Sequence, residues 1–359
     1  MKKTFTPPQL LKLFGELRNL QPLFVAATVA TLTSCGSSKS VSFETNTAEE
    51  SGLNLVKITN ESKNTVLAGK SYSTRWVNSN GIVGWCKEAK FGWSPLRLLS
   101  VSPDGTQLAY VTRSENQDNV MVRGANSQGM ATQRTFRDVS DFCWGADGVI
   151  YFSDRNAVNY NYSNNYIAAV NAKQGNMVQQ LTNGSVNDLN PVVTPDGKKV
   201  FFTRANKLGP SIWSLDRTNG TLTSCAPGFN PCLIPGDPDA FYCVRTSSAG
   251  RSEIWYVNFV KGMETLVLTD KDHSFTNPSL SPDGKWLAVQ GNAMSKKSKK
   301  QNLDIFVVRT DGTQLTQLTY SPAADVCPVW SKDGRSIYFI SSRANKDESY
   351  NIWRMNFSL

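Results

Sequence analysis

The sequence predicts an all-β protein, a six-bladed β-propeller built from four-stranded antiparallel blades. Three observations support this prediction: a hairpin phrase that recurs along the chain, the regular spacing of its copies, and two further short apolar runs after each copy. The clearest copy is PVVTPDGKKVFFTR at 191–204, in which an Asp-Gly turn separates two apolar runs. Asp-Gly between β-branched and aromatic residues predicts a tight hairpin, because glycine accepts the positive φ that such turns require.

The copies of this hairpin are regularly spaced. An aspartate at or near each turn marks them, and the six markers are Asp104, Asp147, Asp196, Asp237, Asp283 and Asp333. Successive markers are 43, 49, 41, 46 and 50 residues apart. This period is slightly longer than a four-stranded propeller blade needs and far longer than a leucine-rich or helical hairpin repeat.

Two more apolar runs follow most hairpins, and their shortness predicts strands rather than helices. The third runs are 119–123, 166–170, 211–215, 253–257, 304–308 and 351–355. The fourth runs are 134–136, 179–182, 221–224, 266–269 and 316–319. Four antiparallel strands in each of six repeats predict a propeller. The last repeat lacks a fourth run, and NLVKIT at 54–59 resembles it, so an N-terminal strand is expected to close the ring and remove the open sheet edges.

The segments before the repeats predict an exported, lipid-anchored chain. Residues 1–34 combine basic residues with a short apolar run, which is too short to span a bilayer and is typical of a signal peptide. LTSCG at 32–36 resembles a lipobox, so we expect lipidation at Cys35; the alternative is an ordinary signal peptide that contains a cysteine. Residues 35–52 are predicted to be a flexible tether and 53–359 the propeller, with 60–95 an uncertain cap or closing segment.

Composition and charge limit the classes of partner. The hydrophobic fraction of 40% and charged fraction of 19% predict a folded core. The whole chain carries a net charge of +9, of which residues 1–34 contribute +3, so the mature chain would carry +6. No segment resembles a nucleic-acid module. We therefore expect no nucleic acid, and a membrane contact through the lipid anchor together with an acidic envelope protein or an anionic glycan.

The recurring hairpins also carry a family resemblance. The Pro-Asp-Gly turns, the Asn-Pro dipeptides at 190–191, 230–231 and 277–278, and strand ends such as FSDR at 152–155 resemble the PD40 repeats of TolB-like propellers, over about 97–357. The resemblance implies a non-enzymatic periplasmic scaffold that binds another envelope component. The same repeats occur in prolyl peptidases and some glycan-processing enzymes, so fold alone does not fix function. The chain departs from TolB in the short segment between Cys35 and the first blade.

The sequence predicts no catalytic residues, no metal and no cofactor. The chain has a single histidine, His273, in the polar loop KDHSFTN, whereas a metal-dependent propeller lyase needs several converging ligands. A prolyl-peptidase mechanism requires a second domain with a G-x-S-x-G elbow, which we do not find. Catalysis by carboxylates alone stays open, but turn chemistry accounts for the repeated aspartates. We therefore expect a non-enzyme.

Binding residues are predicted where the innermost strands start, which we call the start face; the Asp-Gly turns form the opposite turn face. The second strand ends in arginine in five repeats, at Arg113, Arg155, Arg204, Arg245 and Arg343. Repeat five instead carries KKSKK at 296–300, including Lys296 and Lys297. This set predicts a basic docking face. The alternative is that each arginine pairs with a carboxylate of its own or a neighbouring blade, and that KKSKK is a solvated loop.

A second candidate on the start face is the loop NAVNYNYSNNY at 156–166, with Tyr160 and Tyr162. Tyrosine rings and asparagine amides together suit a sugar or a peptide, and they equally suit an irregular loop. Two functions therefore remain open. The first is a lipid-anchored scaffold in the cell envelope, most simply on the outer membrane facing the periplasm. The second is a surface protein that binds or processes glycans.

Overall fold

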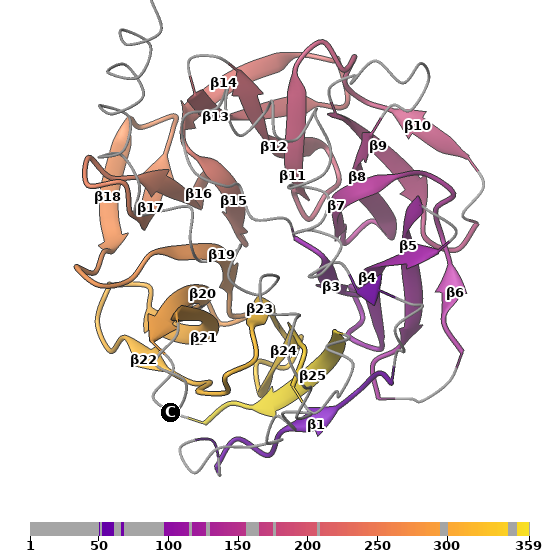
Figure 1. Cartoon of the computed structure of the whole chain (residues 1–359). Helices are drawn as coiled ribbons and strands as arrows, with labels where there is room; N and C mark the ends of the chain where they lie inside the picture. The colour runs from indigo at the N-terminus through magenta and orange to yellow at the C-terminus, as the bar shows by residue number, and fades with distance from the viewer. Residues whose placement is uncertain are drawn as a thin grey trace, which may run out of the picture. The chain divides into compact units, whose positions relative to one another are not determined.

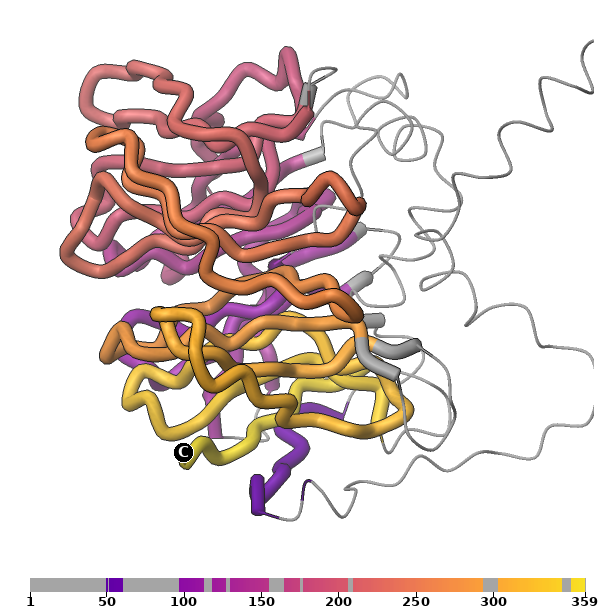
Figure 2. Tube along the Cα trace, turned by 90° about the vertical axis from the view of Figure 1, so that its left-hand side faces the viewer, coloured from indigo at the N-terminus to yellow at the C-terminus, as the bar shows by residue number. Residues whose placement is uncertain are grey.

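A computed structural model describes residues 50, 52–60, 66–67, 97–114, 117–126, 130–155, 165–174, 177–206, 209–294, 301–343 and 350–358. The strands form six antiparallel sheets arranged as a ring around a central axis (Figure 1). Figure 2 shows the same ring from the side, with chain reversals at both ends of the strands. The predicted six-bladed propeller is confirmed. Among the described residues, no helix is long and apolar enough to cross a membrane.

Each blade runs from an inner strand near the axis to an outer strand at the rim. Blade one contains β3 (Leu99–Val101), β4 (Gln107–Ser114), β5 (Gln117–Gly124) and β6 (Thr132–Gln133). Blade two contains β7 (Val139–Trp144), β8 (Val149–Arg155), β9 (Asn165–Asn171) and β10 (Val178–Gln180). Blade three contains β11 (Asn187–Val193), β12 (Lys199–Asn206), β13 (Gly209–Asp216) and β14 (Leu222–Pro227).

The other three blades follow the same order. Blade four contains β15 (Phe229–Ile234), β16 (Asp237–Thr246), β17 (Ser252–Asn258) and β18 (Met263–Leu268). Blade five contains β19 (Phe275–Leu280), β20 (Trp286–Met294), β21 (Gln301–Arg309) and β22 (Thr316–Gln317). Blade six contains β23 (Asp325–Trp330), β24 (Ser336–Ser341), β25 (Asn351–Asn356) and, as its outer strand, β1 (Val56–Lys57).

The N-terminal strand closes the ring through a contact that recurs at the outer strands of the blades. Ile352 of β25 donates its backbone N–H at 2.9 Å to the hydroxyl of Thr59, which lies two residues beyond β1. The same contact joins Ile167 to Thr182 and Ile305 to Thr319, each at 2.9 Å. Thr59 therefore takes the place of an outer-strand threonine in blade six. The expectation that 54–59 supplies the missing strand is confirmed.

Two details differ from the sequence-based expectation or extend it. The fourth run of blade one was expected at 134–136, but the paired strand β6 is Thr132–Gln133, just before it. Within the uncertain segment 60–95, β2 (Val66–Leu67) pairs with the end of β4, through Val66 with Arg113 and Leu67 with Thr112. It thereby extends the position of the inner strand beyond β3. The remainder of that segment lies outside the described residues.

The Asp-Gly hairpins share one set of contacts on the turn face. In blade one, Asp104 Oδ1 accepts hydrogen bonds from the Ser102 hydroxyl at 2.5 Å and the Thr106 amide at 3.0 Å. These bonds favour the ionised carboxylate and lower its pKa to about 2. Gly105 follows with φ of 74°, a conformation that glycine adopts without steric cost. Asp196, Asp283 and Asp333 accept equivalent bonds.

The Asn-Pro dipeptides form a bulge on the inner strands. Asn190, Asn230 and Asn277 have φ values of 52°, 57° and 52°, and the sheet register shifts at each of them. Their backbone amides donate to side chains of the preceding blade, as Asn190 does to Asp141 Oδ2 at 2.9 Å and Asn277 to Asn230 Oδ1 at 2.7 Å. Cys327 takes this place in blade six, with φ of 56°. A belt of buried polar contacts thus joins neighbouring blades around the axis.

Candidate functional site

Four of the five predicted arginines lie in the second strand at its start-face end, and Arg343 follows β24 by two residues. In blade three, for example, Arg204 is paired in register with Asp188 at the beginning of β11. The side chains of Arg204, Arg245 and Arg343 are described. The other predicted positions, namely the side chains of Arg113 and Arg155 and residues Cys35, Tyr160, Tyr162, Lys296 and Lys297, lie outside the described residues.

Arg204 is tied into blade three by a two-pronged ion pair. Its Nε and Nη2 donate to Asp188 Oδ1 and Oδ2 at 2.8 and 2.9 Å. The Asp188 side chain has no exposed surface and Arg204 is only 12% exposed. Burial raises the pKa of Asp188, and Arg204 opposes that rise. The guanidinium carbon also lies 4.8 Å from the centroid of the Trp213 ring, so a cation–π contact fixes its other face.

Arg245 makes the corresponding arrangement in blade four with a different acid. Its Nη1 and Nη2 donate to the two carboxylate oxygens of Glu264 at 2.8 Å each. Glu264 comes from the outer strand β18 and is 43% exposed, whereas Arg245 is 16% exposed. The hydrogen bonds from Arg245 lower the pKa of Glu264. The guanidinium carbon of Arg245 lies 4.9 Å from the centroid of the Trp255 ring, so a cation–π contact forms here as it does between Arg204 and Trp213.

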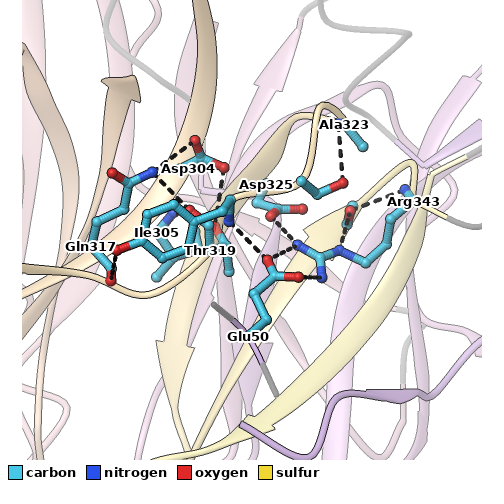
Figure 3. Close-up of polar contacts among 11 residues, drawn as sticks. Glu50, Asp304, Ile305, Gln317, Thr319, Ala323, Asp325 and Arg343 are labelled. Atoms are coloured by element: carbon cyan, nitrogen blue, oxygen red, sulfur yellow. Dashed lines mark hydrogen bonds and ion pairs between the residues drawn. The ribbon is translucent and has the colours of Figure 1, made fainter. Parts of the chain in front are cut away.

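Arg343 is completely buried where the N-terminal segment meets blades five and six (Figure 3). Its guanidinium donates to Glu50 Oε2 at 3.2 Å and Oε1 at 3.1 Å, and also to Asp325 Oδ2. Glu50, which is itself fully buried, accepts a further bond from the Tyr320 amide at 2.8 Å. The ion cluster therefore fastens the end of the predicted tether between the two blades.

A third acid of this cluster, Asp304, lies on the other side of Asp325 in Figure 3. It accepts hydrogen bonds of 3.2 Å from Gln317 and from Thr319. Burial, reinforced by the negative charge of Asp325, raises the pKa of Asp304 to about 8. The cluster thus lowers its own excess of negative charge by keeping a proton on Asp304 at neutral pH.

These contacts are those of the second interpretation of the arginines, in which each pairs with a carboxylate. Each of the three arginines pairs with an acid of its own blade, and Arg343 adds Glu50 from the N-terminal segment. Sequence reasoning did not find Glu50, Asp188, Glu264 or Asp325. The only signal available was the acidic residue at the start of some inner strands, as in Asp188 and Asp325, whereas Glu50 lies in a stretch that reads as a plain tether.

His273 is the single histidine of the sequence and a candidate for acid–base or metal chemistry. His273 Nδ1 lies 2.7 Å from Asp270 Oδ1, and its ring packs against Phe275 and Phe306 with centroids 5.9 and 5.5 Å away. The side chain is thus held as part of the loop before β19. In the described part of the chain, no group of three or more His, Cys, Asp or Glu side chains is arranged to hold a metal ion.

Comparison with known proteins agrees with the repeat pattern. Residues 244–358, which include β17 and β18 of blade four, all of blade five and β23–β25 of blade six, match the model of the TolB beta propeller domain, PD40. A putative TolB from Agrobacterium tumefaciens superposes with a TM-score of 0.55 at 16% identity, over 74% of this chain and 91% of that one. Residues 244–358 thus match a TolB-type propeller, and the ring as a whole is similar in fold. TolB from Acinetobacter baumannii gives the same TM-score at 17% identity, over 70% of this chain and 64% of that one.

Enzymes also occur among the proteins that this TolB-like propeller resembles. An oligogalacturonate lyase from Vibrio parahaemolyticus superposes with a TM-score of 0.52 at 10% identity, over 85% of this chain and 97% of that one. Two curated relatives are an uncharacterized Agrobacterium fabrum protein, Atu1656, at 27% identity over 43% of this chain, and an uncharacterized Bacillus subtilis peptidase, YuxL, at 24% over 58%. The matches span 50% and 31% of those two proteins.

Proposed function

We propose that this protein is a non-enzymatic, lipid-anchored component of the cell envelope whose propeller is a binding scaffold for another envelope protein. The observation that carries the proposal is the position of Glu50. Residues 36–49, which follow the predicted lipidated Cys35, are 14 in number, and a flexible chain of that length spans roughly 20 Å on average. Because Glu50 is locked between blades five and six, the anchor would hold the propeller close to the membrane surface.

The docking surface of this proposal is the start face, and its charge comes from the loops rather than from the arginines that are already paired. Arg343 has no exposed surface, and Arg204 and Arg245 each present only a narrow edge. Arg113, Arg155, Lys296 and Lys297, with Tyr160 and Tyr162, are the remaining proposed contacts. The expected setting is an outer-membrane surface that faces the periplasm. The TolB-like fold supports this assignment by analogy only.

A pull-down tests the proposal, using the full-length protein solubilised in detergent from envelopes, followed by binding measurements on the captured partner. Reversing Lys296, Lys297, Lys299 and Lys300 to Glu should slow association, and the loss should shrink at about 1 M salt, where the Debye length is about 3 Å. Cys35→Ala should abolish fatty-acid labelling without changing the affinity. Unchanged association and unchanged salt dependence after the lysine reversal would remove the start face as the docking surface.

A further inference from the structure

Two adjoining clefts on the turn face of blade six form a groove on the side opposite to the proposed docking surface. The first cleft, of about 580 Å³, lies between blades five and six. The second, of about 450 Å³, lies between β25 and the residues that precede β1. Asp333 and Phe357 line both clefts, so the two are continuous. We call this the blade-six groove; because its lining runs from blade five past β25 to the residues before β1, it suits an extended chain.

Positive charge predominates in the blade-six groove. Four cationic side chains and two carboxylates line it: Lys285, Arg309, Arg335, Arg354, Asp283 and Asp333. Both carboxylates already accept two hydrogen bonds within their own turns through Oδ1. Lys285 Nζ lies 4.0 Å from Asp283 Oδ2, and Arg309 Nε lies 3.9 Å from Asp311 Oδ2, both beyond hydrogen-bonding distance. The groove therefore attracts an anionic ligand.

Aromatic residues form the floor of the groove, but their faces are covered. Trp286 and Trp330 are 8% and 5% exposed. Phe357 packs edge-on against both rings, with centroids 5.7 and 4.6 Å away. The Arg309 guanidinium lies 5.2 Å from the Trp286 ring. A sugar ring would need an open aromatic face, so the groups left for a ligand are the cations of the rim.

The repeat does not create such a groove wherever two blades meet. At the boundary of blades two and three, Arg217 donates to the Tyr151 hydroxyl at 2.5 Å and to the Gly197 carbonyl at 2.7 Å. Tyr151 in turn donates to Asp147 at 2.6 Å. These contacts satisfy the cation and join the two turns directly. The cation at this boundary is thus held by hydrogen bonds, whereas Lys285 and Arg309 beside blade six are not within hydrogen-bonding distance of an acid among the described residues.

We propose that the blade-six groove binds an extended acidic segment of a partner protein, whose carboxylates pair with the four cations of the rim. Guanidinium groups suit this task because their planar donors match a carboxylate in a two-pronged bond. A peptide is favoured over an acidic glycan because the ring faces on the floor are closed. This surface is separate from the start face, so its test does not depend on the proposed function.

The full chain offers a matched set of variants for the test. Lys198, Lys285 and Arg335 occupy the same place in their turns, each donating its backbone N–H to the turn aspartate at 3.0–3.1 Å. Lys285→Glu with Arg335→Glu reverses two charges of the groove. Lys198→Glu with Lys261→Glu reverses two exposed charges elsewhere on the turn face and is the control. The probe is a fluorescein-labelled octaglutamate peptide, followed by anisotropy at about 0.05 M and about 1 M salt.

We expect the groove variant to weaken octaglutamate binding by about tenfold or more at low salt, and the control variant to change it by less than about twofold. Both variants should melt at the wild-type temperature, since all four residues are exposed at the surface. Equal weakening in the two variants would show that only the overall charge attracts the peptide and would overturn the proposal. Tighter binding of a uronic-acid oligosaccharide of equal charge, with the same sensitivity to the groove variant, would overturn the peptide as occupant.

Discussion

On the turn face, four hairpins use the same contacts, whereas on the start face three arginines at one repeat position pair with three different sets of acids. Each turn aspartate finds its donors within two residues on either side, as Asp196 does with Thr194 and Lys198. Arg204 instead uses an inner strand, Arg245 an outer strand, and Arg343 both an inner strand and the N-terminal segment.

A repeated residue makes the same contacts in every blade only when its partners are local in the sequence. A turn is a local problem, so one short phrase solves it in every blade. The arginine instead pairs with an acid that other parts of the chain bring close to it. The exposed fraction of the arginine side chain ranges from none at Arg343 to about a sixth at Arg245. The stabilising effect of each arginine should therefore follow its burial rather than its place in the repeat.

The largest effect is expected at the buried end of this series. Arg343→Ala would leave Glu50 and Asp325 as buried carboxylates without their cation, which typically costs about 3–5 kcal/mol of unfolding free energy. Denaturant unfolding measures the loss. As a control, Arg343→Met combined with Glu50→Gln and Asp325→Asn removes all three charges and should lose clearly less than Arg343→Ala alone. A loss below about 1 kcal/mol in Arg343→Ala would show that the cluster contributes little.

A smaller, pH-dependent effect is expected at Asp304. Between its ordinary pKa of 3.8 and its folded pKa of about 8, the unfolded chain has released the proton and the folded chain has kept it. The free energy of unfolding therefore falls as pH rises across this window, by at most about 1.4 kcal/mol per pH unit. Above the folded pKa this contribution no longer changes with pH. Asp304→Asn should remove this contribution, so its stability relative to wild type should improve from pH 5 to pH 8.

Denaturant unfolding at several pH values compares the two proteins. Thr319→Val, which removes the hydroxyl bonded to Asp304 but keeps the carboxyl group, is the control and should retain a pH-dependent slope. Parallel stability curves for wild type and Asp304→Asn would show that Asp304 does not hold its proton in the folded state.

The sequence predicted the architecture well because the blade is built from local signals. Asp-Gly turns, short apolar runs and the threonine of NLVKIT each act within a few residues or through a repeated register, and the closing strand was found in this way. The acids of the arginines were not predictable, because Asp188, Glu264 and Glu50 lie 16, 19 and 293 residues from their partners. The groove at blade six was missed as well, since Lys285 and Arg335 are ordinary turn residues until the two blades are placed side by side.

The central claim is that the described arginines of the start face hold their blades together, and Arg204→Ala tests it most directly. Arg204 retains an exposed edge, so it has access to a partner as well as to Asp188. We predict that Arg204→Ala lowers the melting temperature, through a loss of about 1–3 kcal/mol for the carboxylate left without its cation. The quadruple reversal of Lys296, Lys297, Lys299 and Lys300 should leave the melting temperature unchanged. An Arg204→Ala protein that melts like wild type but captures less partner would contradict the account.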